Sequence, residues 1–390
     1  MNRASADDAP LMVAAALALA AAVSLGLARF SYALLLPPMR ADLGWSYLTA
    51  GAMNTANAAG YLAGALLAPS MLARFGARSV LLAGNLGTVL LLALHGLVLD
   101  DAALFTLRAL TGVASAASFV CGGLLAARLA GGSSKAGLVL GLYYGGTGVG
   151  IVASAVLVPA LASRPVVHAW QGAWWGLALA ALAATAVTAR ATRALAAPAS
   201  AATQRAAFDW RPFGFGLAGY FMFGLGYIGY MTFVITLLRE QQLAPGLIIA
   251  FFVLLGAAVV GSSWLWAGLL QRCRGGEALA LLNALLAVAT LLPVLSARPL
   301  AVFASGLLFG AVFLSVVAST TALVRHNLPA SKWSGGIAAF TIVFAAGQIV
   351  GPTLVGWVSD GRGGLAAGLG CSAAALAAGA LLGWRQKPVS

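Results

Sequence analysis

Long runs of apolar residues, separated by short polar or charged stretches, follow one another along the whole chain. Each run is long enough to cross the hydrocarbon core of a bilayer, which takes about 20 helical residues. We therefore predict an all-α membrane protein with twelve transmembrane helices, over residues 11–37, 46–72, 79–99, 102–128, 137–162, 168–190, 212–238, 246–270, 277–296, 299–324, 334–358 and 365–384.

The longest stretch without an apolar run divides the predicted helices into two sets of six. Residues 191–211 are polar, basic and rich in Ala and Pro. We predict an N-terminal six-helix bundle over 1–190, a cytoplasmic linker over 191–211 and a C-terminal six-helix bundle over 212–390. The halves resemble each other, since residues 26–32 align with residues 224–230 at an offset of 198. Parallel repeats of this kind are typical of secondary transporters.

The loops on the two sides of the predicted helices differ in their basic residues. If the N-terminus is cytoplasmic, the cytoplasmic segments hold fifteen of the 22 Lys and Arg residues, the opposite side holds five, and two lie within helices. Cytoplasmic loops carry an excess of Lys and Arg, so we expect both termini in the cytoplasm and a multi-pass protein of the cell inner (plasma) membrane. The long apolar run after the charged start favours a retained first helix over a cleaved signal peptide.

The composition agrees with a surface that mostly faces lipid. The chain is 62% hydrophobic and 8% charged, whereas soluble proteins are about 25% charged, so its expected surroundings are the lipid bilayer. The net charge of +13 is spread singly and in pairs between apolar runs, and nucleic-acid binding is therefore not expected. The three Cys lie far apart, which predicts neither a disulfide framework nor a metal site. We expect a monomer without a cofactor.

Two other functional classes are disfavoured. An intramembrane enzyme would need a base, a nucleophile or metal ligands, and the predicted helices contain no carboxylate pair, His cluster or Ser/His/Asp set. We therefore predict that the protein is not an enzyme. A receptor or assembly protein built on a transporter scaffold usually adds docking domains, and the longest loop here has only about twenty residues.

Several segments resemble the major facilitator superfamily. Residues 72–78, after the second predicted helix, are similar to its short cytoplasmic loop signature, but Ala73 stands where an Asp is usual. The gate salt bridge that relies on that Asp is therefore not predicted here. Arg108 and Gly112 match the Arg-x-x-x-Gly signature of the fourth helix. The fifth helix is similar to the glycine-rich motif of exchangers, with Gly146 in place of the usual Pro.

Two further segments resemble the YbfB/YjiJ-like branch of this superfamily. Residues 26–44 are similar to its first helix and residues 347–360 to its eleventh, and the resemblance covers essentially the whole chain. It implies two pseudo-symmetric six-helix bundles and secondary active transport by alternating access through a central cavity, but says little about the substrate. The residues expected to have gating or conformational roles are Arg74, Gly76, Arg78, Gly145, Gly150, Gly351 and Pro352.

Two arginines lie inside the predicted helices without a carboxylate at the same depth. Arg29 is about nine residues from the outer end of the first helix and Arg108 about six from that of the fourth, roughly 10–14 Å deep at about 1.5 Å per residue. All nine acidic residues fall in loops or at helix ends. A charge at this depth costs several kcal/mol unless it is paired or hydrated, so it usually marks a functional position. The resemblance implies that both guanidinium groups face the central cavity, which helices one and four line.

We predict that a small organic anion, such as a carboxylate, supplies the missing negative charge and accepts bidentate hydrogen bonds from arginine. The alternative is that each arginine bonds to backbone carbonyls of a neighbouring helix and locks the bundle. We favour substrate binding for Arg29 and the structural role for Arg108. The alternative function is efflux of neutral or amphipathic drugs or metabolites. Proton symport, exchange and uniport are all compatible with the sequence.

Other polar residues within the helices are candidates for the same small-molecule site. The duplication pairs Arg29 with Tyr227, whose phenol can donate a hydrogen bond to an anion. Asn54 and Asn57 share one face of the second helix, where they would line the cavity or bond to neighbouring helices. The predicted substrate-binding set is Arg29, Arg108, Tyr32, Tyr227, Tyr230, Asn54, Asn57, Tyr143, Tyr144 and Gln348.

Overall fold

The computed structural model describes residues 3–131, 135–193, 195 and 208–389. Most of the predicted linker over 191–211 lies outside these residues. The described chain consists of helices joined by short connections, and twelve helical segments are long and apolar enough to cross a membrane. The predicted all-α fold with twelve membrane-length helices is confirmed.

The chain divides into two compact units. The first contains Met1–Leu43 and Ala56–Ala202, and the second contains Gly44–Thr55 and Thr203–Ser390. The helix α3 (Tyr47–Phe75) therefore contributes its first turns to the second unit and its remainder to the first.

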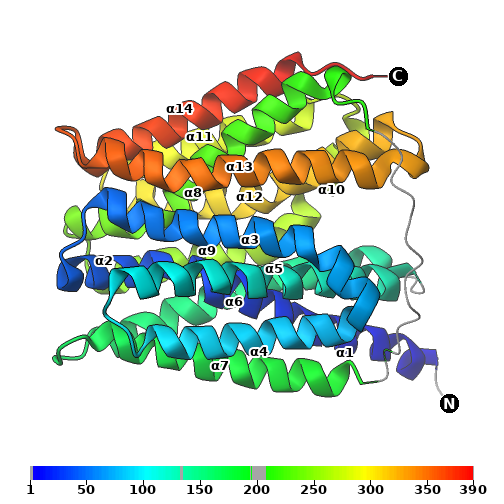
Figure 1. The fold of residues 1–390 in the computed structure, drawn as a ribbon. Coiled ribbons are helices and arrows are strands. Elements are labelled where there is room, and N and C mark those ends of the chain that lie inside the picture. The colour runs from blue at the N-terminus through cyan, green and yellow to red at the C-terminus, as the bar shows by residue number, and fades with distance from the viewer. Residues whose placement is uncertain (1–2, 132–134, 194, 196–207, 390) are drawn as a thin grey trace. The chain divides into compact units, whose positions relative to one another are not determined.

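The first unit begins with one membrane-length segment built from three consecutive helices. In this unit α6 packs against α1 and η1, whereas α4 packs against α5 and α7. Figure 1 shows α4 and α7 running side by side. Besides α3, the helices of this unit are α1 (Arg3–Ala21), the π-helix η1 (Ala22–Phe30), α2 (Tyr32–Leu43), α4 (Ala77–His95), α5 (Asp101–Gly131), α6 (Ala136–Ala162) and α7 (Ala169–Ala191).

The second unit is organised around α8, which packs against both α13 and α14, as Figure 1 also shows. In the same unit α12 packs against α9 and α11. The helices of this unit are the short η2 (Arg211–Phe213), α8 (Gly214–Glu240), α9 (Pro245–Leu265), α10 (Ala267–Arg272), α11 (Glu277–Leu295), α12 (Pro299–Asn327), the short η3 (Ala330–Lys332), α13 (Trp333–Ser359) and α14 (Gly364–Arg385).

The first membrane-length segment is longer than predicted, because it continues through Pro37 and Pro38 to Leu43. Proline interrupts helices in water, but in membrane helices neighbouring groups satisfy the carbonyls that it leaves unbonded. Arg29 consequently lies 14 residues from Leu43, or roughly 21 Å along the helix. Arg29 is therefore close to the middle of the segment.

Two other predicted helices have different ends. The helix predicted over 79–99 ends at His95, where the N–H of Gly96 donates a hydrogen bond to the carbonyl oxygen of Ala93. The helix predicted over 246–270 is interrupted at Trp266, which separates α9 from α10. These changes lie at helix ends and leave the number of spanning segments unaltered.

Glycine permits close helix crossings in both units. A Cβ added to Gly26 would stand 2.4 Å from the Cα of Gly150, so η1 and α6 touch through their backbones. In the second unit a Cβ added to Gly224 would stand 2.5 Å from the carbonyl oxygen of Phe344, and one on Gly347 would stand 3.0 Å from the backbone nitrogen of Leu225. Small residues allow such contacts between membrane helices, where dispersion rather than the hydrophobic effect drives association.

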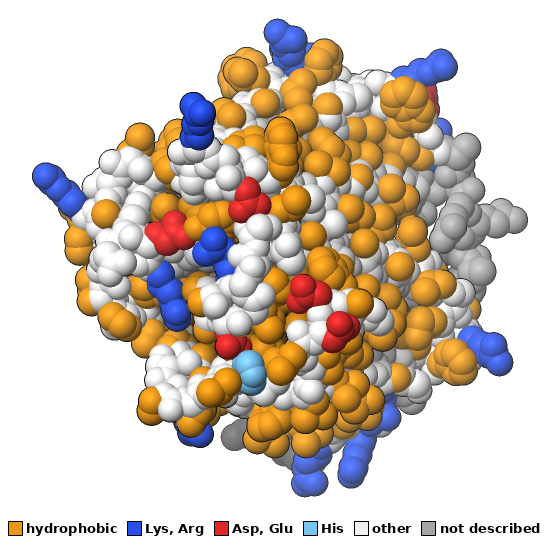
Figure 2. All heavy atoms as spheres, turned by 60° about the vertical axis from the view of Figure 1, so that its left-hand side comes forward, with side chains coloured by type: hydrophobic (Ala, Val, Ile, Leu, Met, Phe, Trp, Pro, Cys, Tyr) orange, Lys and Arg blue, Asp and Glu red, His pale blue; other side chains and the backbone are white. Residues whose placement is uncertain are grey.

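Large apolar side chains remain exposed on the outside of the helices. Leu90 is 60% exposed, Leu300 83% and Trp357 65%. Figure 2 shows many hydrophobic side chains on the visible surface, while several charged side chains gather on one part of it and others project singly at the rim. Such extensive apolar exposure is unfavourable in water but suits contact with lipid.

Candidate functional site

A π-helical turn in the middle of the first membrane-length segment carries Arg29. The N–H of Ser31 donates to the carbonyl oxygen of Gly26 at 3.0 Å, five residues earlier, instead of the usual four. Turns of this kind insert one extra residue into an α-helix and are frequent at functional sites. Arg29 lies within this wider turn, which the hydrophobic periodicity of the sequence did not predict.

The Arg29 side chain is buried and has unused donors. It is 3% exposed, and its Cζ lies 5.3 Å from the centroid of the Tyr61 ring. Its Nε and Nη2 have no hydrogen-bond partner, and Arg29 forms no ion pair with any carboxylate in the described part of the chain. A buried guanidinium group in this state lacks the hydrogen bonds that normally offset its loss of hydration.

Tyr61 was missed in the sequence analysis. It lies four residues after Asn57 on α3 and therefore on the same helix face. That spacing was the available signal, but the contact with Arg29 depends on how α3 packs against η1.

Arg108 has a different environment, although it lies near Arg29. It is 1% exposed, its Nη1 donates to the carbonyl oxygen of Ala28 at 3.1 Å, and its Cζ lies 4.5 Å from the centroid of the Tyr32 ring. The backbone of Arg108 is held as well, because Asn57 Nδ2 donates to its carbonyl oxygen at 3.0 Å. The structure thus brings Arg29, Arg108, Tyr32 and Asn57 together in the first unit.

The remaining charges are distributed away from this cluster. Among the side chains whose burial the structure describes, Arg29 and Arg108 are the only Arg, Lys, Asp or Glu that are buried. The described acidic side chains lie in loops or near helix ends. The first unit therefore holds buried positive charge without a buried carboxylate among these side chains.

The candidates of the C-terminal half form a separate group in the second unit. Gln348 Nε2 donates to the hydroxyl of Tyr227, and the Tyr230 hydroxyl lies 2.7 Å from Ser305 Oγ. Asn54, from the part of α3 that belongs to this unit, donates to Thr232 Oγ1 at 2.6 Å. Although Asn54 and Asn57 share a helix face, they thus bond to neighbours in different units.

Aromatic rings stack along α8, α12 and α13 beside this group. The Tyr227 ring stacks on Phe223 at 4.7 Å, on Phe344 at 5.7 Å and on Phe313 at 5.9 Å between centroids. We call Tyr220, Phe223, Tyr227, Phe313 and Phe344 the aromatic ladder. Four of these five side chains are at most 3% exposed, so the aromatic ladder belongs to the interior of the second unit.

The two tyrosines predicted on the fifth helix are placed differently. Tyr143 is fully buried, and its hydroxyl donates to the carbonyl oxygen of Phe119 at 2.6 Å. Tyr144 is 41% exposed. The ring that lies under the Arg29 Cζ is that of Tyr61 instead.

The residues expected to have conformational roles occupy turns and helix crossings. Gly76 has φ +77°, a backbone conformation that favours glycine. Next to it, the Cζ of Arg74 lies 5.2 Å from the Phe75 ring centroid, and Arg78 Nη2 donates to the carbonyl oxygen of Ala189 at 3.0 Å.

Two glycines of this set, Gly150 and Gly351, lie where helices cross. Gly145 is buried on α6, and Gly150 meets Gly26 as described above. In the second unit a Cβ on Gly351 would lie 2.4 Å from the carbonyl oxygen of Leu225. A Cβ on Gly51 would lie 2.1 Å from the carbonyl oxygen of Pro352.

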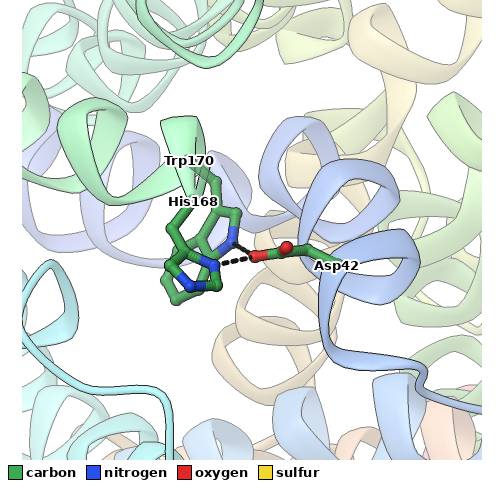
Figure 3. Close-up of polar contacts among 3 residues, drawn as sticks. All are labelled: Asp42, His168 and Trp170. Atoms are coloured by element: carbon green, nitrogen blue, oxygen red, sulfur yellow. Dashed lines mark hydrogen bonds and ion pairs between the residues drawn. The ribbon is translucent and has the colours of Figure 1, made fainter. Parts of the chain in front are cut away.

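One polar cluster at the end of α2 was not predicted. Asp42 Oδ2 accepts hydrogen bonds from Trp170 Nε1 and His168 Nδ1, each at 2.5 Å, as Figure 3 shows. These contacts tie the end of α2 to the start of α7. The partners are separated by 126 and 128 residues, and the sequence contains no signal that pairs them.

A second polar cluster, within the second unit, was also missed. Asp360 Oδ1 accepts from the backbone N–H of Tyr47 at 2.8 Å, and Oδ2 from that of Leu48 at 2.9 Å. The Tyr47 hydroxyl donates to Glu240. Asp360 thus satisfies two of the free N–H groups at the start of α3, which is the task of a helix cap.

The described residues contain no group of three or more His, Cys, Asp or Glu side chains that could hold a metal ion. The Arg29 side chain carries a positive charge and two unused hydrogen-bond donors, and it lies against an aromatic ring.

Comparison with known proteins identifies the family. The family described as "Uncharacterised MFS-type transporter YbfB", MFS being the major facilitator superfamily, matches residues 2–383. None of the curated protein sequences matches the chain. The fold is similar to that of the nucleoside transporter NupG, with 14% identity, a TM-score of 0.70 and coverage of 95% of this chain and 97% of that one.

A second solved structure is similar. It is a bacterial homologue of the human lysosomal transporter Spinster in an inward-facing, occupied conformation, with 14% identity, a TM-score of 0.73 and coverage of 95% of both chains. At these identities the structural likeness concerns the fold, whereas the family match extends over nearly the whole sequence. The chain therefore belongs to the YbfB family of MFS-type transporters.

Proposed function

We propose that this transporter moves a small organic anion across the cell inner membrane by alternating access, with both termini in the cytoplasm. Arg29 is the residue that binds the anion. The observation that carries the proposal is a guanidinium group near the middle of a membrane-length segment, 3% exposed, whose Nε and Nη2 have no hydrogen-bond partner.

The environment of Arg29 supports an anionic ligand. A buried charge is stable when an opposite charge and hydrogen-bond acceptors replace its hydration shell. The described chain offers Arg29 the face of Tyr61 but no carboxylate. A transported anion would supply both the charge and the acceptors, and only while it is bound.

Arg108 takes a positioning role in this proposal. Its guanidinium already donates to the Ala28 carbonyl and lies over Tyr32. Ala28 immediately precedes Arg29 in the π-helical turn. Arg108 therefore holds the backbone next to Arg29 and raises the local positive potential. This is the structural role expected for Arg108, in which it bonds to a backbone carbonyl of a neighbouring helix.

The aromatic ladder favours a second candidate, efflux of neutral or amphipathic compounds. Its rings stack nearly parallel, with interplanar angles of 18° between Phe223 and Tyr227 and 16° between Tyr227 and Phe344. Flat apolar faces suit an organic body whatever its charge. The two candidates differ in whether binding requires a negative charge.

A binding screen on the purified full-length protein separates the candidates. The panel contains carboxylates, phosphorylated metabolites, neutral aromatic compounds and lipophilic cations, and the readout is the thermal unfolding temperature. A ligand that binds only the folded state raises this temperature. We expect stabilisation by anions; stabilisation by neutral compounds or cations and by no anion would contradict the proposal.

Replacement of Arg29 tests the residue itself. Arg29→Ala should abolish uptake of the stabilising anion into proteoliposomes while the protein still inserts and elutes as a folded species. Arg298→Ala, which removes an exposed arginine, is the matched control and should transport normally. Normal transport by Arg29→Ala would assign Arg29 a structural role.

A further inference from the structure

The edge of Arg29 that lacks partners narrows the class of anion. Its Nε and Nη2 are the two atoms without hydrogen bonds. In a guanidinium group the Nε–H and one Nη2–H point in the same direction along one edge of the plane. This edge can donate two parallel hydrogen bonds, while the Cζ of the group lies over the Tyr61 ring, 5.3 Å from its centroid.

A planar group with two oxygens matches such an edge. The two oxygens of one carboxylate accept two parallel N–H bonds from arginine, which gives directionality as well as charge neutralisation. A single-atom anion would lie between the two donors, so neither N–H would point straight at it, whereas a carboxylate gives each N–H its own oxygen.

Arg29 offers one edge of two donors without partners, which limits the ligand to one carboxylate held in this way. Arg29 and Arg108 are the only charged Arg, Lys, Asp or Glu side chains buried in the described part of the chain. The Arg108 guanidinium already donates to the Ala28 carbonyl and stacks over Tyr32. The second charge of a dicarboxylate or a phosphate would lie near Arg108 but would have no such pair of donors of its own, and a buried anionic group without hydrogen bonds is costly.

We propose that the anion bound at Arg29 is a monocarboxylate, held side-on by Nε and Nη2. This inference rests on the proposed function, since it requires that Arg29 binds the transported anion. It adds the charge of the ligand, the shape of its anionic group and the edge of Arg29 that holds it.

A set of matched probes tests the ligand class on the unmodified full-length protein. Hexanoate and benzoate carry one carboxylate, hexanamide and benzamide are their neutral counterparts, adipate and phthalate carry two carboxylates, phenyl phosphate carries a phosphate, and tetraphenylphosphonium is a cation. Thermal unfolding and titration calorimetry measure binding. We expect hexanoate or benzoate to bind at least about tenfold more tightly than its amide and than the dianions, the factor that loss of one charge-assisted hydrogen bond produces.

Each outcome supports or overturns the monocarboxylate inference, and the results also show separately whether the protein binds organic anions at all. Adipate, phthalate or phenyl phosphate binding as tightly as the monocarboxylates would overturn the monocarboxylate inference and leave an organic-anion transporter. Binding of the amides or of tetraphenylphosphonium, with no binding of any anion, would overturn both. No binding of either monocarboxylate would also overturn the inference.

Arg29→Lys tests the side-on geometry. Lysine keeps the positive charge but has a single ammonium group instead of a planar edge. We expect this variant to lose at least about tenfold in affinity for the better of the two monocarboxylates, whereas Arg298→Lys, at an exposed position, should bind as the wild type does. Unchanged affinity in Arg29→Lys would refute the side-on edge, while a charge-dependent anion site would stand. If Arg29→Lys does not fold, the probe series on the wild type decides the inference.

Discussion

Gly26 and Gly150 lie backbone to backbone in the first unit, so close that a Cβ on Gly26 would stand 2.4 Å from the Cα of Gly150. Gly26 also provides the carbonyl oxygen that accepts the Ser31 N–H and closes the π-helical turn. Arg29 lies within that turn. The helix crossing and the proposed anion site therefore share one short piece of backbone.

Gly150→Ala should destabilise the protein and impair ligand binding together. The added Cβ would stand 2.5 Å from the Ala22 carbonyl oxygen and 2.8 Å from the Gly26 Cα, so η1 and α6 must separate. Overpacking of this kind costs about 1–3 kcal/mol, which thermal unfolding in detergent would report. Gly137→Ala, on the same helix with nothing within 4 Å of the new Cβ, is the control. Equal stability of the two variants would show that the close crossing is not required.

Arg108→Ala should lower stability more than Arg29→Ala. The first change removes the hydrogen bond to the Ala28 carbonyl and the contact with Tyr32, together worth about 1–3 kcal/mol. Arg29→Ala removes a buried charge whose Nε and Nη2 have no partner, so its loss should cost little and can even stabilise. The unfolding temperatures of the two purified variants test this order of stabilities. A larger decrease in Arg29→Ala than in Arg108→Ala would contradict the roles we assign to these arginines.

Trp170→Phe and Asp42→Asn should show coupled effects on stability. Trp170 is 1% exposed and donates to Asp42 Oδ2 at 2.5 Å, and a hydrogen bond to a charged group contributes about 1.5–3 kcal/mol. The double variant should therefore be more stable than the sum of the single effects predicts. Trp175→Phe removes a bond to the Ala93 carbonyl from a side chain that is 44% exposed, and should cost less. Additive effects of Trp170→Phe and Asp42→Asn would mean that the bond contributes nothing to stability.

Asp360→Ala should loosen the start of α3. The carboxylate accepts the backbone N–H groups of Tyr47 and Leu48, and loss of a helix cap costs about 1 kcal/mol. Amide hydrogen exchange should become faster at these two residues, while exchange in the interior of α8 stays unchanged. Arg362→Ala, two residues further along and exposed, should leave exchange at Tyr47 and Leu48 as it is. If Asp360→Ala also leaves exchange at Tyr47 and Leu48 unchanged, water satisfies these N–H groups as well as the carboxylate does, and the prediction is wrong.

The candidate site could be predicted in part. Arg29 and Arg108 stand out in the sequence because a charge within a long apolar run is rare and costly. Their different surroundings could not be read there, since the Ala28 carbonyl, Tyr32 and Tyr61 reach them only through packing. The helix end expected at Pro37 was wrong for a related reason. The rule that proline ends a helix assumes that unbonded carbonyls have no other partner, which the interior of a membrane protein can provide.

The sequence by itself determined the class of protein, the twelve membrane-length helices and the presence of two intramembrane arginines, because these follow from local hydrophobicity and charge. Its motifs also identified the superfamily that the family match confirms. Only the tertiary structure decided that Arg29 lies on a π-helical turn with an unpartnered edge, that Arg108 is bonded to the backbone beside it, and that Asp42 meets His168 and Trp170. The physical reason is that hydrogen bonds and ring contacts are set by distances between residues on different helices, and hydrophobic periodicity carries no information about which helix faces which.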